Sequence, residues 1–177
     1  MQSNNWNPAI RAQHWLTVLL MILCVGAVWG HEAFDKTDPL RAQLMQLHFL
    51  LGGAIGLLTL LRLATRAFIT GPAHATTPTL ALLAKLGHLG IYLLMLALPV
   101  CGYIAVSGKG VPIDLLGLIE IPPLPVGKEW GKAFKELHEG LANGLLALLA
   151  LHVAAAVLHA VVLKDKVLHS MLGRADR

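Results

Sequence analysis

Charged residues are too scarce in this chain for the surface of a soluble domain. Asp, Glu, Lys and Arg together make up 14% of the 177 residues, whereas about a quarter is usual in soluble globular proteins. Hydrophobic residues make up 56%, and the mean hydropathy is +0.66. A soluble globular domain is therefore excluded, and we expect one integral membrane domain over residues 1–177.

Cysteine is also scarce, and the motifs of several enzyme classes are missing. Cys24 and Cys101 both fall in apolar segments, where a thiol behaves as a small hydrophobic side chain and no disulfide is expected. The sequence has no glycine-rich nucleotide loop, no cysteine motif for an iron–sulfur cluster and no hydrolase constellation. The net charge of +4 suits residues that flank a membrane, so no nucleic-acid partner is expected.

Long apolar segments stand in place of charge. Four of them approach the ~20 residues that a helix needs to cross the hydrocarbon core of a bilayer. Backbone polar groups must be satisfied internally in lipid, so these segments are expected to be helices. The predicted fold class is all-α, an integral membrane four-helix bundle. Its helices are expected at about 8–30, 44–66, 84–107 and 136–163, with an outer loop at 108–135.

Basic residues fall unevenly on the two ends of this bundle. The end with both termini and the loop between the second and third helices has eight basic and two acidic residues. The opposite end has six basic and eight acidic residues. Cytoplasmic loops carry the excess of Lys and Arg in membrane proteins, so both termini are predicted to be cytoplasmic.

Nine histidines are unusual in so apolar a chain, because a histidine within a span normally faces the bundle interior and has a partner or a cofactor. His138 and His152 are fourteen residues apart, which is about 21 Å along a helix and nearly the same face. His48 can face His138 at the outer level, and His14 can face His152 at the inner level. Three further histidines are expected in loops or the tail: His31, His74 and His169.

Two opposed pairs at two depths favour haem over other metal centres. A zinc or copper site needs three or four converging ligands, whereas a haem takes one axial ligand on each face. Small residues follow three of the histidines: Gly52, Gly53, Gly56, Gly144, Ala155 and Ala156. They leave room for a flat macrocycle, although small residues also let membrane helices approach closely. With both axial positions filled, one-electron transfer is expected rather than oxygen activation.

Sequence motifs occur in order along all four expected helices: QHWL at His14, LHFLLGG at His48 followed by LLRLATR, LGHLGIYLLMLALPVCGY, LHEGLAN and ALHVAAAVLH. They resemble the bacterial cytochrome b561 family. LGHLGIYLL and LHVAAAVLH are particularly similar to its superoxide oxidase branch, whose members are superoxide:ubiquinone oxidoreductases of the inner membrane. The outer loop departs from that branch, which also often has two adjacent histidines where this chain has only His159.

The resemblance implies two stacked haem b groups, one ligated by His14 with His152 and one by His48 with His138. It also implies a superoxide oxidase of the bacterial inner membrane, which passes electrons from periplasmic superoxide through the haems to ubiquinone. One alternative is a cytochrome b relay subunit that links quinone to a separate dehydrogenase or hydrogenase as its redox partner. A second alternative is a haem-free membrane protein whose histidines shuttle protons or bind a metal.

Two histidines and two arginines are further candidates at the inner end. His88 and His159 could hydrogen-bond a quinone and deliver a proton, or satisfy haem propionates or backbone carbonyls. Arg62 and Arg66 are four residues apart on one face. They could bind propionates, with Arg62 the better placed, or they could anchor the helix at the membrane surface.

Three lysines are candidates at the outer end: Lys128, Lys132 and Lys135. They recur at helical spacing after the extended segment IPPLP, while Trp130, Phe134 and Leu137 form an apolar face. This pattern predicts an amphipathic lead-in to the fourth helix. The lysines could raise the local concentration of superoxide, or they could contact lipid headgroups among nearby glutamates.

Overall fold

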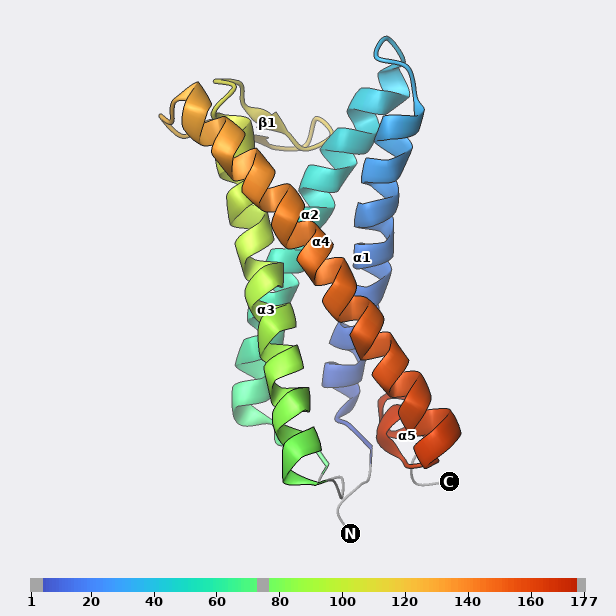
Figure 1. Cartoon of the computed structure of the whole chain (residues 1–177). Helices are drawn as coiled ribbons and strands as arrows, with labels where there is room; N and C mark the ends of the chain where they lie inside the picture. Colours follow the sequence, from blue (N-terminus) through green and yellow to red (C-terminus); the bar gives the residue numbers. More distant parts are fainter. Residues whose placement is uncertain (1–4, 73–76, 175–177) are drawn as a thin grey trace.

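The computed structural model describes residues 5–72 and 77–174. Its four long helices are α1 (Pro8–Ala33), α2 (Pro39–Phe68), α3 (Pro78–Ser107) and α4 (Lys128–Leu158). The last of them continues as a π-helix, η1 (His159–Leu163), before the short helix α5 (Val167–Leu172) (Figure 1). The α3–α4 connection contains an antiparallel pair of strands, β1 (Ile113–Asp114) and β2 (Glu120–Ile121). All four long helices are long and apolar enough to cross a membrane, which confirms the predicted four-helix membrane bundle.

The helices are longer than the ranges expected from apolar runs alone. The second begins at Pro39 rather than 44, the third at Pro78 rather than 84 and the fourth at Lys128 rather than 136. Each of the first three has a proline in its first turn, where a missing N–H costs nothing, and a polar side chain caps it. Hydropathy finds the lipid-embedded part of a helix, whereas these capped first turns extend beyond it.

The outer loop is correspondingly shorter than the expected 108–135, because the amphipathic lead-in forms the first turns of α4. His31 also differs from expectation. It lies in the last turn of α1, where its Nδ1 is 2.8 Å from the Arg41 carbonyl. His169 lies in α5, and His74 is outside the described residues.

Two close helix pairs make up the bundle. α1 packs along α2 and α3 packs along α4, while α2 and α3 join the pairs. Figure 1 shows α4 crossing the bundle obliquely from the end near β1 to the end near α5. One apolar cluster connects all four helices at mid-depth, formed by Cys24, Leu51, Ile55, Met95 and Leu145. The strongest direct packing is therefore within the pairs and at this central layer.

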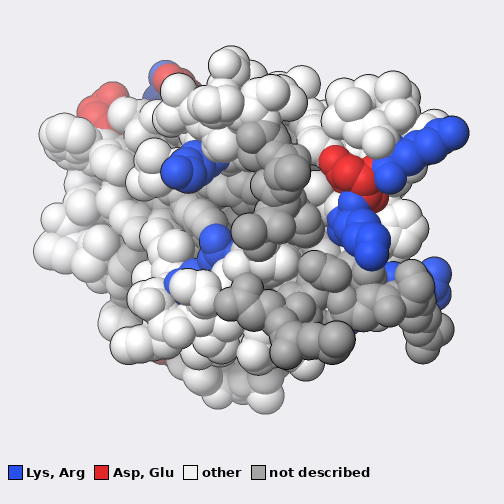
Figure 2. All heavy atoms as spheres, turned by 90° about the horizontal axis from the view of Figure 1, so that it is seen from below, with Lys and Arg blue, Asp and Glu red and all other residues white. Residues whose placement is uncertain are grey.

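Basic groups are prominent at the end of the bundle that carries α5. The described basic residues there are Arg11, Arg62, Arg66, Lys85, Lys164, Lys166 and Arg174. Figure 2 looks at this end and shows Lys and Arg atoms at several places, with few Asp or Glu atoms among them. This is the end that the sequence predicts to face the cytoplasm.

The crossing of α3 and α4 near β1 depends on two glycines. A Cβ added at Gly131 would lie 2.7 Å from the Gly108 Cα, and one added at Gly108 would lie 2.5 Å from the Gly131 Cα. Backbone lies against backbone there, so no flexible side chain can move aside. The contact fixes the position of the first turn of α4.

We expect Gly131→Ala to destabilise the bundle, because overpacking usually costs about 1–3 kcal/mol. The higher helix propensity of alanine offsets part of this cost. Gly26→Ala is the matched control, because a Cβ at Gly26 in α1 meets no atom within 4 Å. Thermal unfolding in detergent, followed by circular dichroism, measures the difference. Equal melting temperatures for the two variants would show that α3 and α4 do not touch at this crossing.

Candidate functional site

The outer pair of histidines lies between α2 and α4. His48 is about 14 Å from the start of α2 and His138 about 15 Å from the start of α4, and both helices start at the same end. Their ring centroids are 6.1 Å apart. The two residues therefore meet at one depth, as expected from the sequence.

Backbone carbonyls fix the orientation of both rings. His48 Nδ1 is 3.2 Å from the Cys24 carbonyl oxygen, and His138 Nδ1 is 3.0 Å from that of Leu98. A carbonyl can only accept, so Nδ1 carries the proton in each ring and Nε2 keeps its lone pair. This is the state in which an imidazole binds a metal, and a carbonyl partner on the other nitrogen is typical of metal-binding histidines.

The inner level contains three histidines rather than the expected pair. His14 of α1 and His152 of α4 have ring centroids 6.3 Å apart. His88 of α3 is also close, with its centroid 5.4 Å from that of His152. Residue spacing alone does not show that three helices converge at this level, so the approach of His88 to His152 is a finding of the structure. His88 Nδ1 lies 2.6 Å from the Ala84 carbonyl, so its Nε2 also keeps a lone pair.

The distances within both pairs suit two ligands on opposite faces of one metal. A metal–imidazole bond is about 2 Å long and the ring centre lies about 1 Å behind the nitrogen, which gives centroids about 6 Å apart. The His48–His138 and His14–His152 separations, 6.1 and 6.3 Å, agree with this value. In the described part of the chain, no group of three or more His, Cys, Asp or Glu residues is arranged to hold a metal ion.

The surroundings of the histidines fit a flat macrocycle. Each histidine pair joins α4 to a helix of the α1–α2 pair. It therefore crosses between the two helix pairs, where direct helix packing is weakest. An added Cβ would meet no atom within 4 Å at two half-buried glycines near the histidines, Gly52 and Gly87. At Gly102 it would lie 3.3 Å from the His138 ring, so this glycine gives the ring its place. The residues present therefore fit haem at both levels.

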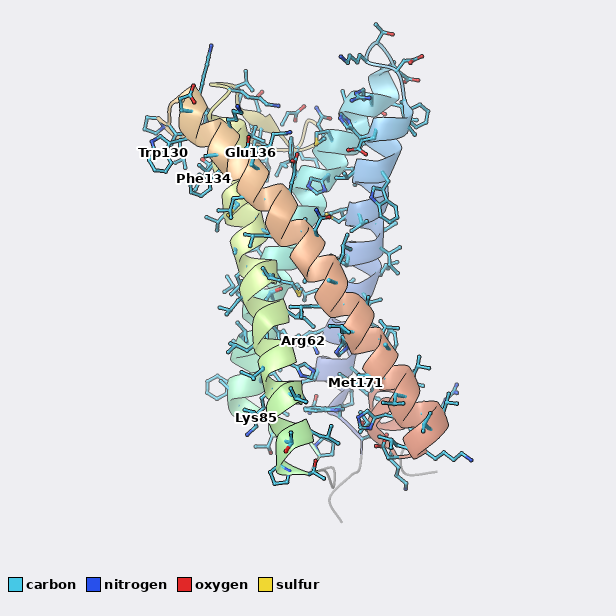
Figure 3. The ribbon with its side chains drawn as sticks, in the orientation of Figure 1. Arg62, Lys85, Trp130, Phe134, Glu136 and Met171 are labelled. Atoms are coloured by element: carbon cyan, nitrogen blue, oxygen red, sulfur yellow. The ribbon has the colours of Figure 1, made fainter. Side chains whose placement is uncertain are left out.

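Arg62 is a half-buried cation next to the inner pair. Its Nη1 lies 3.0 Å from His14 Nδ1, and its guanidinium carbon lies 5.8 Å from the centroid of the Tyr92 ring. Its Nε is buried and has no hydrogen-bond partner among the described residues. A guanidinium with an unsatisfied donor inside an apolar bundle fits an anionic group such as a haem propionate. Figure 3 shows Arg62 among the helices, in the half of the bundle nearer α5.

Arg66 is in a different environment, although it shares a helix with Arg62. Its guanidinium carbon lies 4.4 Å from the centroid of the Trp6 ring, and the residue is exposed. A cation stacked on an aromatic ring near a helix end is typical of anchoring at the membrane surface. The two arginines that the sequence grouped together therefore have separate surroundings.

The three outer lysines line one groove of about 420 Å³, together with Lys109. Sequence spacing could not reveal Lys109, because only the Gly108–Gly131 crossing brings the end of α3 to the start of α4. One of the cations is partly neutralised, since Lys135 Nζ is 2.9 Å from Glu139 Oε1. The Trp130 and Phe134 rings lie side by side on the outer side of α4, tilted by 43° with their centroids 6.2 Å apart (Figure 3).

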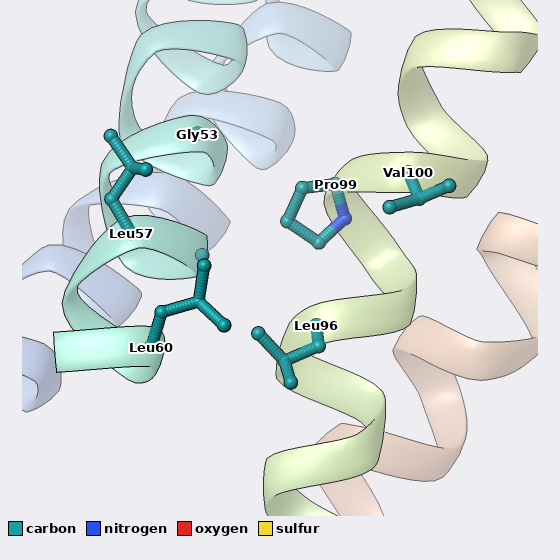
Figure 4. Close-up of a pocket in the computed structure, with 7 residues that line it drawn as sticks. Gly53, Leu57, Leu60, Leu96, Pro99 and Val100 are labelled. Atoms are coloured by element: carbon teal, nitrogen blue, oxygen red, sulfur yellow. The ribbon is translucent and has the colours of Figure 1, made fainter. Parts of the chain in front are cut away.

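A second groove, between α2 and α3, is entirely apolar. It has a volume of about 370 Å³ and is lined by Gly53, Gly56, Leu57, Leu60, Leu96, Pro99 and Val100 (Figure 4). No lining side chain can hydrogen-bond a quinone ring, so the groove lacks the hydrogen-bonding groups that His88 and His159 have.

His159 lies in η1, where its Nδ1 contacts the carboxylate of Asp165. Residue spacing in the sequence does not reveal this contact.

Comparison with known proteins identifies the family of this chain. A family model described as prokaryotic cytochrome b561 matches residues 5–174. The chain is similar to a probable superoxide oxidase CybB of Yersinia pestis, with 31% identity over 163 residues and 90% of each chain covered. It is 27% identical over 172 residues to cytochrome b561 homolog 2 of Escherichia coli (strain K12), covering 93% of this chain and 89% of that one. A cytochrome b562 of Cereibacter sphaeroides is 31% identical over 126 residues, covering 71% of this chain and 66% of that one. The chain belongs to the prokaryotic cytochrome b561 family, whose members are haem b proteins of membrane electron transfer.

Proposed function

We propose that the protein is a superoxide oxidase, which transfers electrons from superoxide at the outer face of the bacterial inner membrane to ubiquinone. The observation that carries this proposal is the presence of two opposed histidine pairs, at two depths of one bundle. Similarity to a probable superoxide oxidase supports superoxide as the electron donor. The basic residues at the α5 end support cytoplasmic termini, with the His48–His138 level on the periplasmic side.

The four histidines divide between two haem b groups in this proposal. His48 and His138 hold the outer group, and His14 and His152 hold the inner group, with Arg62 on a propionate. When bound, each haem would supply one-electron transfer, with one histidine pair holding it. The protein residues hold the groups in place and exclude water between them.

Electrons and protons balance over two superoxide anions. Each superoxide loses one electron and leaves as dioxygen, and one ubiquinone gains two electrons and two protons to form ubiquinol. The outer lysines attract the anionic donor. His88 and His159, at the inner end, hydrogen-bond the quinone and supply protons to it.

Stopped-flow mixing of the purified oxidised holoprotein with superoxide tests the function directly. The haem α-band should appear rapidly, and a water-soluble ubiquinone should then restore the oxidised spectrum. A haem spectrum that ignores superoxide but responds to quinol would refute the proposed donor, and it would favour a relay subunit with a separate dehydrogenase or hydrogenase. Protein from haem-replete cells that lacks any haem spectrum would refute both functions.

We expect His138→Ala and His14→Ala each to reduce the haem content to about one per chain, because each removes one axial ligand. His88→Ala should keep about two haems, since the proposal leaves His88 off the iron. Haem content per chain and a redox titration measure the outcome. If His88→Ala loses the inner haem while His14→Ala keeps it, His88 and not His14 is the partner of His152.

We expect Lys132→Gln to slow haem reduction by superoxide about two- to tenfold at low salt, because the groove loses a cation that attracts the anion. The difference from the native protein should disappear near ~1 M salt, where the Debye length falls to about 3 Å. Lys36→Gln is the matched control, since Lys36 lies in the α1–α2 connection outside the groove. A rate that is unchanged by Lys132→Gln at every ionic strength would contradict a steering role.

A further inference from the structure

The inner end of α4 departs from a regular helix in two ways. η1 has the wider π-helical turn, and Lys164 follows it in the left-handed conformation, with φ of 50°. Among the described residues, the non-glycine positions with positive φ are Leu116 and Lys164. The left-handed conformation is unfavourable for an L-residue, and π-helical turns occur frequently at functional sites. This irregular turn creates a contact that a regular helix could not make.

The turn brings Asp165 back against His159. Asp165 Oδ2 is 2.5 Å from His159 Nδ1, and the Asp165 N–H donates to the His159 carbonyl over 3.2 Å. In a regular α-helix, a residue six positions later lies about 9 Å further along the axis and on another face. The other carboxylate oxygen, Oδ1, accepts the N–H of Val167 at the start of α5 over 3.0 Å. Both oxygens of the carboxylate are therefore fixed.

Basic residues flank this His–Asp pair in the sequence. Asp165 is the only Asp or Glu between Glu139 and Asp176 in the sequence. Lys164 and Lys166 lie directly before and after it in the turn, and His169 follows in α5. The His159 and Asp165 side chains are 26% and 35% exposed, so protons can reach the pair from its surroundings.

The carboxylate determines what the His159 ring can do. His159 Nδ1–H donates to Asp165, so Nε2 is the nitrogen left for a substrate. A carboxylate on the far nitrogen also holds the ring orientation and balances the positive charge when Nε2 carries a proton. His159 follows His152 by seven residues, or about two helical turns. It therefore lies on about the same face as His152 and nearer the inner end of the bundle.

We propose that Asp165 is a positioning residue, which holds His159 in place to donate a proton to ubiquinone at the inner end of the bundle. The inference rests on the proposed function. In the step, the Nε2–H bond of His159 breaks and an O–H bond forms on a quinone oxygen, as the quinone gains electrons that came from superoxide. His159 becomes neutral and regains its proton from water on the inner side. Asp165 remains ionised throughout.

Asp165→Asn tests the proposal, because asparagine keeps the size of the side chain and removes its charge. With excess superoxide, kcat for ubiquinone reduction should fall about 10²-fold, the lower range for loss of a positioned proton donor. KM for ubiquinone and the rate of haem reduction by superoxide should change little. His159→Gln should lower kcat similarly, and the double variant should be no slower than His159→Gln, because the two residues act as one unit.

Asp38→Asn is the matched control. Asp38 Oδ1 accepts the Leu40 N–H over 2.8 Å at the start of α2, as Asp165 Oδ1 accepts that of Val167. Asp38→Asn therefore makes the same loss of charge at a capping side chain that has no histidine partner, and its kcat should equal that of the native protein. If Asp165→Asn does not accumulate in membranes, the solvent isotope effect on kcat is measured instead, in the native protein and in His159→Gln. A large effect in the native protein that is absent in His159→Gln supports proton donation by this pair.

The outcomes separate this inference from the proposed function. A native protein that is reduced by superoxide but does not reduce ubiquinone refutes both the acceptor and the inference. Normal ubiquinone reduction in Asp165→Asn, together with a slow His159→Gln, overturns the role of Asp165 and leaves the function intact. An altered haem spectrum or equal slowing of both half-reactions in Asp165→Asn also overturns it, since the residue is then only structural.

Discussion

A polar side chain in a lipid-embedded helix must find its partner within the protein, and the architecture of this bundle depends on that constraint. The Cys24 carbonyl satisfies His48 from the neighbouring helix of its own pair, and the Leu98 carbonyl does the same for His138. Each bond uses the nitrogen that a metal does not need. For His48 and His138, the interactions that make a buried imidazole tolerable in lipid therefore also prepare it for ligation.

The division of the bundle into two helix pairs explains where the site can form. Packing within α1–α2 and within α3–α4 is close, so a flat group fits only between the pairs. α4 crosses the bundle obliquely, and it brings His138 to α2 at one level and His152 to α1 at the other (Figure 1). One tilted helix thus contributes a histidine to both levels, while α1 and α2 contribute one each.

Depth along a helix could be predicted from the sequence, whereas convergence between helices could not. Residue spacing and helix direction were enough to match His48 with His138 and His14 with His152. They could not show that His88 approaches His152, because that depends on the packing of α3 against α4. Lys109 and Asp165 were missed for a related reason, since a close glycine crossing and a left-handed turn bring them to their partners. Hydropathy also missed the capped first turns of α2 and α3, which lie outside the apolar runs.

The apolar layer at mid-depth separates the two levels of histidines. Leu145 lies midway between His138 and His152 on α4, and Leu51, Ile55 and Met95 pack around it. Electrons can tunnel across such a layer, whereas Cys24 is the one polar side chain in the described cluster, too few to relay a proton across it. In the proposed direction each electron therefore crosses unaccompanied, and the protons for the quinone enter from the cytoplasm. Turnover would then charge the membrane negative inside, so that removing a toxic oxygen species also helps to energise the cell.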